Sequence, residues 1–243
     1  MLDERIRVGQ VERLDHFHAN ELDCDVAMLQ QSGLHLVPSA RRTRAGWGGY
    51  TVPVFALATR AGGVVSIRPD LANAAVQELV DAPRDAPLGE PFFERLRRLA
   101  RRAVPYVYSL SGYALYCDHG SFRAYGGPAP MLAERLDRAD KRGQDLRRRF
   151  DGEIFVVSGT RGEIASWAAL KLKSAEVWEI AVVTEAAYRG RGYARQVVSA
   201  ATDYILSHGR LALYVHDRTN HASARVCRSL GYVEYAEEFF SEY

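Results

Sequence analysis

A glycine-rich stretch in the second half of the chain carries the clearest chemical signal. It runs from Tyr188 to Ala194 and reads Tyr-Arg-Gly-Arg-Gly-Tyr-Ala. Glycines let a backbone approach a ligand closely, and the N–H groups at the start of a following helix carry partial positive charge. Such a loop is suited to an anionic phosphate, and a turn that only caps a helix is the alternative. It lacks the lysine and spacing of the nucleotide P-loop, and its two glycines make a poor dinucleotide fingerprint.

Hydrophobic periodicity predicts a strand before this loop and a helix after it. The strand is expected over Glu176 to Thr184 and the helix over Tyr193 to Ser207, with Gly209 as its stop. Two hairpin-linked strands precede them, and a strand, a short helix and a final strand follow, at residues 153–159, 163–173, 211–215, 222–230 and 232–240. This order predicts a mixed α/β layer around one sheet.

The rest of the chain is harder to interpret. Helices and strands are expected at residues 2–36 (mainly helical), 51–68 (two strands), 73–80 and 91–102 (helices), around Tyr106 and Tyr108 (a strand), and at 131–150 (one charged helix, or two broken near Gly143). The arginines of the helix over 91–102 are either a solvated face, which the near-neutral chain favours, or a phosphate-binding strip. The stretch from Gly126 to Pro130 marks the clearest boundary.

Two motifs in this second half resemble those of the GNAT acyltransferase superfamily. The family's cofactor pattern, R-x-x-G-x-[GA], is filled by Arg189, Gly192 and Ala194. In its second motif an Asn precedes a small residue by three positions and a Gly-aromatic pair by eleven, and these places are filled by Asn220, Ser223, Gly231 and Tyr232. Both motifs occur in the family's order, and the resemblance covers about residues 150–240.

The resemblance implies a fold and a division into domains. The expected fold class is α/β (α+β), with a GNAT-like mixed, mostly antiparallel central sheet flanked by helices in the C-terminal half. Residues 1–127 would form a smaller mixed α/β accessory domain, and residues 128–243 the catalytic domain that binds acetyl-CoA. Many family members add one more strand after the place where this chain ends, so a homodimer that covers the sheet edge is allowed for.

The resemblance also implies a reaction: transfer of an acetyl group from acetyl-CoA, the co-substrate, to a primary amine by direct attack. The acceptor would be a small molecule or a peptide. The pyrophosphate would lie on the loop and the pantetheine arm beside the preceding strand, where a β-bulge opens a slot. The expected cofactor-binding residues are Val182, Val183, Thr184, Arg189, Gly190, Arg191, Gly192, Tyr193, Ala194, Asn220 and Ser223. A backbone N–H near Val182 or Val183 would hold the thioester carbonyl.

Proton transfer requires a base and an acid. Glu179 is the candidate base, with pairing to an arginine as the alternative, and Glu185 is a weaker candidate. Many family members carry a Tyr seven residues after the motif Asn, but here that position is Cys227. A thiol can donate a proton, but a packing role is favoured for this one. Tyr214, Tyr232 or water would then supply the proton, or the thiolate would leave unassisted. For Asn220, helix capping is the alternative to pantetheine contact.

Composition limits the partners. With 32 Lys and Arg against 30 Asp and Glu the net charge is +2, which gives no case for a dedicated nucleic-acid or membrane binder. Three widely spaced cysteines form no zinc pair and indicate a reduced, cytoplasmic setting, and no secretory signal or membrane-length apolar run is present. We expect no metal. The rival function is a non-catalytic acyl-CoA-binding module that regulates a partner. The only lysines are Lys141, Lys171 and Lys173.

Overall fold

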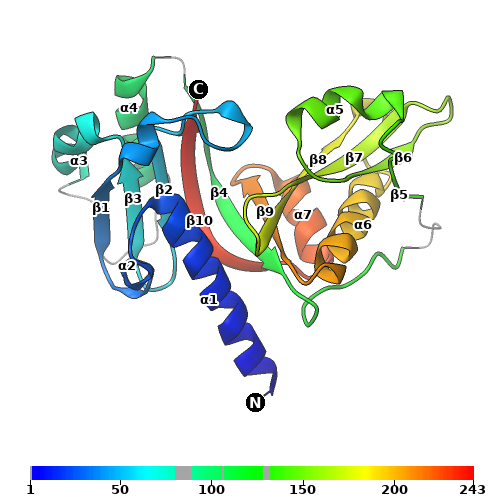
Figure 1. The fold of residues 1–243 in the computed structure, drawn as a ribbon, viewed down its shortest axis with the longest axis horizontal. Coiled ribbons are helices and arrows are strands. Elements are labelled where there is room, and N and C mark those ends of the chain that lie inside the picture. The colour runs from blue at the N-terminus through cyan, green and yellow to red at the C-terminus, as the bar shows by residue number, and fades with distance from the viewer. Residues whose placement is uncertain (1, 80–88, 106, 128–131) are drawn as a thin grey trace. The chain divides into compact units, whose positions relative to one another are not determined.

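The computed structural model describes residues 2–79, 89–105, 107–127 and 132–243, with side chains from residue 9 onward. The chain forms two compact units (Figure 1). Unit 1 comprises Met1–Ala114, Asp217–Thr219 and Tyr235–Tyr243, and unit 2 comprises Leu115–His216 and Asn220–Glu234. Each unit therefore draws on separate stretches of the sequence. The division into 1–127 and 128–243 stays a prediction.

Unit 2 is built on a mostly antiparallel sheet. Its strands run in the order β9-β8-β7-β6-β5, and β8 and β9 are the parallel pair. Their bounds are β5 Glu134–Arg135, β6 Ile154–Ser158, β7 Ile164–Lys171, β8 Val177–Thr184 and β9 Leu211–Asp217, and the helices are α5 Gln144–Arg149, α6 Tyr193–Ser207 and α7 His221–Ser229. These elements confirm the expected mixed α/β class.

The two faces of this sheet are covered by different helices. Trp178 of β8 contacts the rings of Tyr204 and His208 at the end of α6, with centroid distances of 6.4 and 5.6 Å. Trp167 of β7 contacts Phe150, directly after α5, at 5.5 Å. Because side chains alternate along a strand, residues 178 and 180 of β8 share the α6 face and residues 179, 181 and 183 face the other way.

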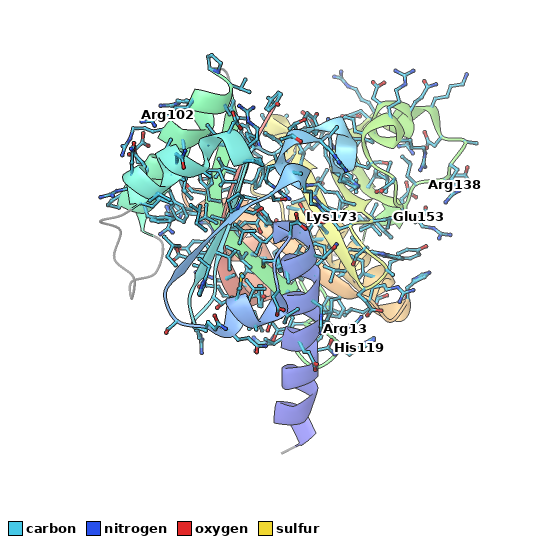
Figure 2. The ribbon with its side chains drawn as sticks, turned by 60° about the vertical axis from the view of Figure 1, so that its left-hand side comes forward. Arg13, Arg102, His119, Arg138, Glu153 and Lys173 are labelled. Atoms are coloured by element: carbon cyan, nitrogen blue, oxygen red, sulfur yellow. The ribbon has the colours of Figure 1, made fainter. Side chains whose placement is uncertain are left out.

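The helix expected over residues 131–150 is wrong for most of its length. Met131 lies outside the described residues, β5 begins at Glu134, and a 3₁₀ turn η4 (Lys141–Gly143) leads into the short α5. Glu134 pairs with Val156 of β6, so pairing with a distant strand overrides the helical preference of this charged segment. The alternative of two helices broken near Gly143 is also wrong, because within residues 132–150 only η4 and α5 are helical and they follow each other directly. Beside β6, Arg138 and Glu153 form an ion pair of 3.0 Å (Figure 2).

Unit 1 has its own strands, ordered β1-β3-β2-β10-β4. The bounds are α1 Leu2–Leu22, α2 Val26–Gln30, β1 Leu34–Pro38, η1 Ala40–Thr43, η2 Trp47–Gly49, β2 Val54–Ala58, β3 Gly63–Ile67, η3 Pro69–Leu71, α3 Ala72–Leu79, α4 Glu90–Ala103, β4 Tyr108–Cys117 and β10 Val233–Glu242. Helix through Leu36 is wrong, because residues 34–38 pair in parallel with β3. The strands within 51–68 and the two later helices are confirmed, although Val80 and Tyr106 lie outside the described residues.

Helices cover both faces of the unit 1 sheet. One core packs α3 and α4 against the strands, with the rings of Phe93 and Phe239 stacked at 6.1 Å. The other packs α1 and α2 against residues such as Leu57 and Val64. Two of the arginines of α4 reach α3: Arg98 donates to the Glu78 carboxylate at 2.9 Å and Arg95 to the Glu78 carbonyl at 2.8 Å. In the described ranges, the helices are too short or too polar to cross a membrane.

Candidate active site

Two neighbouring strands of unit 2, β8 and β9, separate in the middle of the sheet. β8 and β9 pair only from Val177 with Leu211 to Glu179 with Leu213. Beyond that point β8 stays paired with β7 up to Thr184, so its other edge has no strand partner among the described residues. The parting was expected, but it needs no bulge in β8: the register shift lies between β6 and β7, at Val157 and Ser158. An unpaired strand edge can accept another extended chain.

The hydrogen-bond pattern decides which N–H groups face the unpaired edge. Glu185, just after β8, donates its N–H to the Ala165 carbonyl at 3.0 Å on the β7 side. Because N–H directions alternate along a strand, those of residues 183 and 181 also face β7. The N–H groups of Val182 and Thr184 therefore face the opposite edge, where β9 has left.

The loop after β8 has the conformation that its glycines were expected to permit. After the 3₁₀ turn η5 (Ala186–Tyr188), Gly190 and Gly192 adopt left-handed φ angles of 77° and 79°. Nothing lies within 4 Å of a Cβ built at either position, so glycine is needed for the backbone angle rather than for space. Gly192 is the N-cap of α6 and offers no side-chain acceptor. No N-cap side chain therefore accepts a hydrogen bond from the first N–H groups of this 15-residue helix.

Two exposed arginines are tied into the loop. Arg189 donates from Nε to the Thr184 carbonyl at 3.2 Å. Arg191 donates to the Ala187 carbonyl at 3.3 Å and lies over the Tyr188 ring, 5.3 Å from its centroid. Both cations therefore lie beside the uncapped start of α6, which adds to the positive potential that an anionic group would meet there.

Glu179 lies where β8 and β9 separate. It is 8% exposed, and its carboxylate pairs with Lys171 Nζ at 2.5 Å and Lys173 Nζ at 3.6 Å. Burial alone would raise the pKa of Glu179, but the two ammonium groups outweigh burial and lower it. The carboxylate is therefore ionised at neutral pH. Its partners are lysines rather than the arginine weighed from the sequence, and Glu185 is an exposed residue beyond the strand end.

The residues of the second motif form a connected group around α7. Asn220 is the N-cap of this helix and accepts the Ser223 N–H at 3.0 Å, so the capping role is present. The Ser223 hydroxyl shares a hydrogen bond of 2.8 Å with the Tyr214 hydroxyl. Cys227 is fully buried and donates to the Ala224 carbonyl at 3.3 Å. Burial raises the pKa of Tyr214, and it raises that of Cys227 to about 11.

The structure thus separates the predicted acid and base. Glu179 faces away from α6, whereas Tyr214 contacts α7, which packs beside α6. The strand edge that ends at Thr184 lies between these two faces. Tyr232, the other tyrosine weighed as an acid, is buried and shares a hydrogen bond of 2.7 Å with Thr202 in α6.

Lys171 and Lys173 are site residues that sequence reasoning missed. A signal was available: Lys171 is the last residue of β7, which pairs with β8, and Lys173 follows two positions later, in the same alternation. In the described part of the chain, no group of three or more His, Cys, Asp or Glu is placed to hold a metal ion.

A family comparison agrees with this geometry. The acetyltransferase (GNAT) family matches residues 113–232, which include the parted strands, the loop and α7. Residues 113–232 are a GNAT acetyltransferase domain. The expected family is confirmed for these residues. The family supports the general activity of an acyltransferase that uses acetyl-CoA. No curated protein matches the chain.

Several solved structures are similar to this chain. A GNAT-family protein from Novosphingobium aromaticivorans is 17% identical, with a TM-score of 0.48, over 73% of this chain and 82% of that one. A GCN5-related N-acetyltransferase-like protein from Streptococcus suis is 18% identical, with a TM-score of 0.46, over 78% and 84%. The protein yncA from Salmonella typhimurium, solved with its cofactor acetyl-CoA, is 18% identical, with a TM-score of 0.33, over 41% and 68%.

Proposed function

We propose that unit 2 transfers an acetyl group from acetyl-CoA to a primary amine by direct attack. The observation that carries this proposal is the parting of β8 and β9 immediately before a left-handed glycine loop. The two features supply, in the right order along the chain, an unpaired strand edge for an extended arm and a helix start for a phosphate.

The residues present fit acetyl-CoA. The N–H groups that follow Gly192 would hold the pyrophosphate, with Arg189 and Arg191 adding positive charge. The edge of β8 at Val182 and Thr184 would pair with the amide groups of the pantetheine arm, and Asn220 and Ser223 would contact it from the α7 side. The Val182 N–H, which faces that edge, is placed to stabilise the charge that develops on the thioester oxygen.

The proton chemistry follows from the carboxylate and the buried donors. A lysine-like amine has a pKa of about 10.4 and must lose a proton before it attacks. Glu179, ionised and close to the start of the unpaired edge, accepts that proton. Tyr214 and Cys227 stay protonated near neutral pH. They are the candidate proton donors, Cys227 within α7 and Tyr214 beside it. A buried, protonated thiol is a poor nucleophile, so the reaction proceeds without an acyl-enzyme on Cys227.

Calorimetric titration with acetyl-CoA tests the binding half of the proposal. We expect the wild-type protein to bind and an Arg189→Ala, Gly192→Asp double variant to bind at least tenfold more weakly, since the aspartate places negative charge at the helix start. A Gly209→Asp variant, altered at a left-handed glycine after the same helix, is the matched control and should bind normally. Equal binding by all three proteins would place the cofactor elsewhere.

Thiol release from acetyl-CoA in the presence of an amine panel tests the catalytic half. Amine-dependent release supports transfer. Binding without release for any amine supports instead the rival function, an acyl-CoA-binding regulatory module. Two observations favour that rival: Glu179 is paired with two lysines, and a cysteine stands at the usual tyrosine position. The cytoplasmic location and a homodimer remain part of the proposal.

A further inference from the structure

Two of the three lysines in the chain meet at one carboxylate. Lys171 and Lys173 reach Glu179, whereas Lys141 lies exposed in η4. The chain has 32 basic residues, and all but these three are arginines. A guanidinium pairs with a carboxylate through two parallel hydrogen bonds, so the need for an ion pair alone does not account for lysine at this place.

Lysine differs from arginine in its chemistry. An ammonium group loses its proton readily in a shielded site, and the neutral amine is a nucleophile that can be acylated, whereas a guanidinium stays protonated. The residues beside the proposed base are therefore primary amines, the same chemical class as the acceptor that we propose for the reaction.

The position of Lys171 fits that of an acceptor. It stands directly opposite Glu179 in the β7–β8 ladder, and Glu179 is the last residue of β8 that pairs with β9. Its Nζ lies 2.5 Å from the carboxylate, and 23% of its side chain is exposed. Lys173, labelled in Figure 2, approaches the other carboxylate oxygen at 3.6 Å. An amine of the protein thus lies within hydrogen-bond distance of the proposed base.

We propose that Lys171 accepts the acetyl group from acetyl-CoA when no other amine is bound. This inference rests on the proposed function. The ammonium gives one proton to Glu179, and the neutral nitrogen attacks the thioester carbon. The new N–C bond forms as the C–S bond breaks and its electron pair stays on sulfur. The nitrogen then loses its second proton, which ends on the thiolate. The products are N-acetyl-Lys171 and CoA.

The modification would change the site that performs it. An amide carries no charge and cannot form an ion pair with Glu179, so acetylation of Lys171 removes the closer of the two cations at the base. The carboxylate is then open on that side to an external amine. Self-acetylation therefore prepares the site for turnover rather than ending it.

Mass spectrometry of the intact chain incubated with isotopically labelled acetyl-CoA, without an added amine, tests this inference. The chain has three lysines. Lys141 is assigned from its own peptide, and Lys171 and Lys173 are distinguished by the fragment ions of the peptide that holds both. We expect label on Lys171 at least tenfold above that on Lys141, at a rate independent of protein concentration. Lys171→Arg, which keeps the positive charge at the carboxylate, should abolish the label, and Lys141→Arg should leave it unchanged.

The outcomes separate this inference from the proposed function. Equal label on all three lysines, or label on Lys171 that persists in the Gly192→Asp variant, indicates chemical acetylation and overturns the inference. An unlabelled Lys171 in a protein that binds acetyl-CoA and acetylates amines overturns the inference and leaves the proposed function standing. Failure to bind acetyl-CoA overturns both.

Discussion

Replacing Glu179 by glutamine tests the energetics and the chemistry of the site together. The change keeps the size of the side chain and removes its charge. Removing one partner of a buried ion pair costs about 3 to 5 kcal/mol. We expect the lower end, about 3 kcal/mol, because the two lysine side chains keep 23% and 22% of their surface exposed. At about 2 to 4 °C per kcal/mol for a chain of this length, Tm should fall by about 6 to 12 °C.

The same variant should lose activity without losing acetyl-CoA. A positioned general base contributes about 10² to 10⁴ in rate, so kcat should fall at least a hundredfold while the calorimetric Kd stays within a factor of two. The assay is thiol release at saturating acetyl-CoA, well below the variant's Tm. Glu176→Gln, at an exposed position just before β8, is the matched control and should change Tm by less than about 2 °C.

The acid side of the stability curve gives an independent reading. The pKa of Glu179 is lowered in the folded protein, so its contribution is fully present above the unfolded value of about 4.3 and is lost as pH falls through the lower folded value. The difference between wild type and Glu179→Gln should therefore shrink below about pH 4. A variant with full kcat and a lowered Tm would refute the role of Glu179 as base, and an unchanged Tm would refute the energetic argument.

Three further outcomes follow from unit 2. Gly231→Ala should destabilise by more than about 3 kcal/mol, since its φ is +87° and a Cβ would lie 1.8 Å from a backbone oxygen, whereas Gly209→Ala, at φ +69° with open space, should cost about 1 to 2 kcal/mol; similar denaturant midpoints for the two would contradict this. Thr202→Val should cost about 1 to 3 kcal/mol more stability than Tyr232→Phe. Thr202→Val leaves the buried Tyr232 hydroxyl without this partner, whereas Tyr232→Phe leaves the Thr202 hydroxyl bonded to the Val198 carbonyl in its own helix. Thermal melts of both single variants and of the double variant check this asymmetry. Cys227→Ala should keep kcat within about fivefold, consistent with a thiol whose pKa is raised to about 11, and total loss with intact acetyl-CoA binding would show that the packing assignment is wrong.

The sequence predicted the elements around the loop well because their signals are local. The helix over residues 193–207 has the bounds that its periodicity gave, and left-handed Gly192 and Gly209 stand at its two ends. The hairpin of β6 and β7 likewise follows from two apolar runs and a short turn. Local patterns suffice where a segment pairs with its neighbours in sequence.

Non-local pairing explains most of what was missed. The strand at residues 34–38 was not predicted, because its partner strand β3 begins 29 positions later in the sequence, at Gly63. The strand at Glu134 depends in the same way on β6. The ion pairs of Glu179 with the two lysines were not predicted, because strand register rather than sequence spacing brings residues 171 and 179 opposite each other.

The pairing of β2 with β10 has a consequence for how the protein is made. Val54–Ala58 pairs with residues 237–241, so one sheet of unit 1 joins segments separated by most of the chain. A ribosome releases the first of these segments long before the second. Until residues 237–241 emerge, β2 presents an apolar, unpaired edge, a surface that binds chaperones and promotes aggregation when exposed. Bringing such distant segments together is also slow. We therefore expect the N-terminal region to reach its final structure only after residues 237–241 have left the ribosome, and a stop codon placed before residue 235 to leave it insoluble.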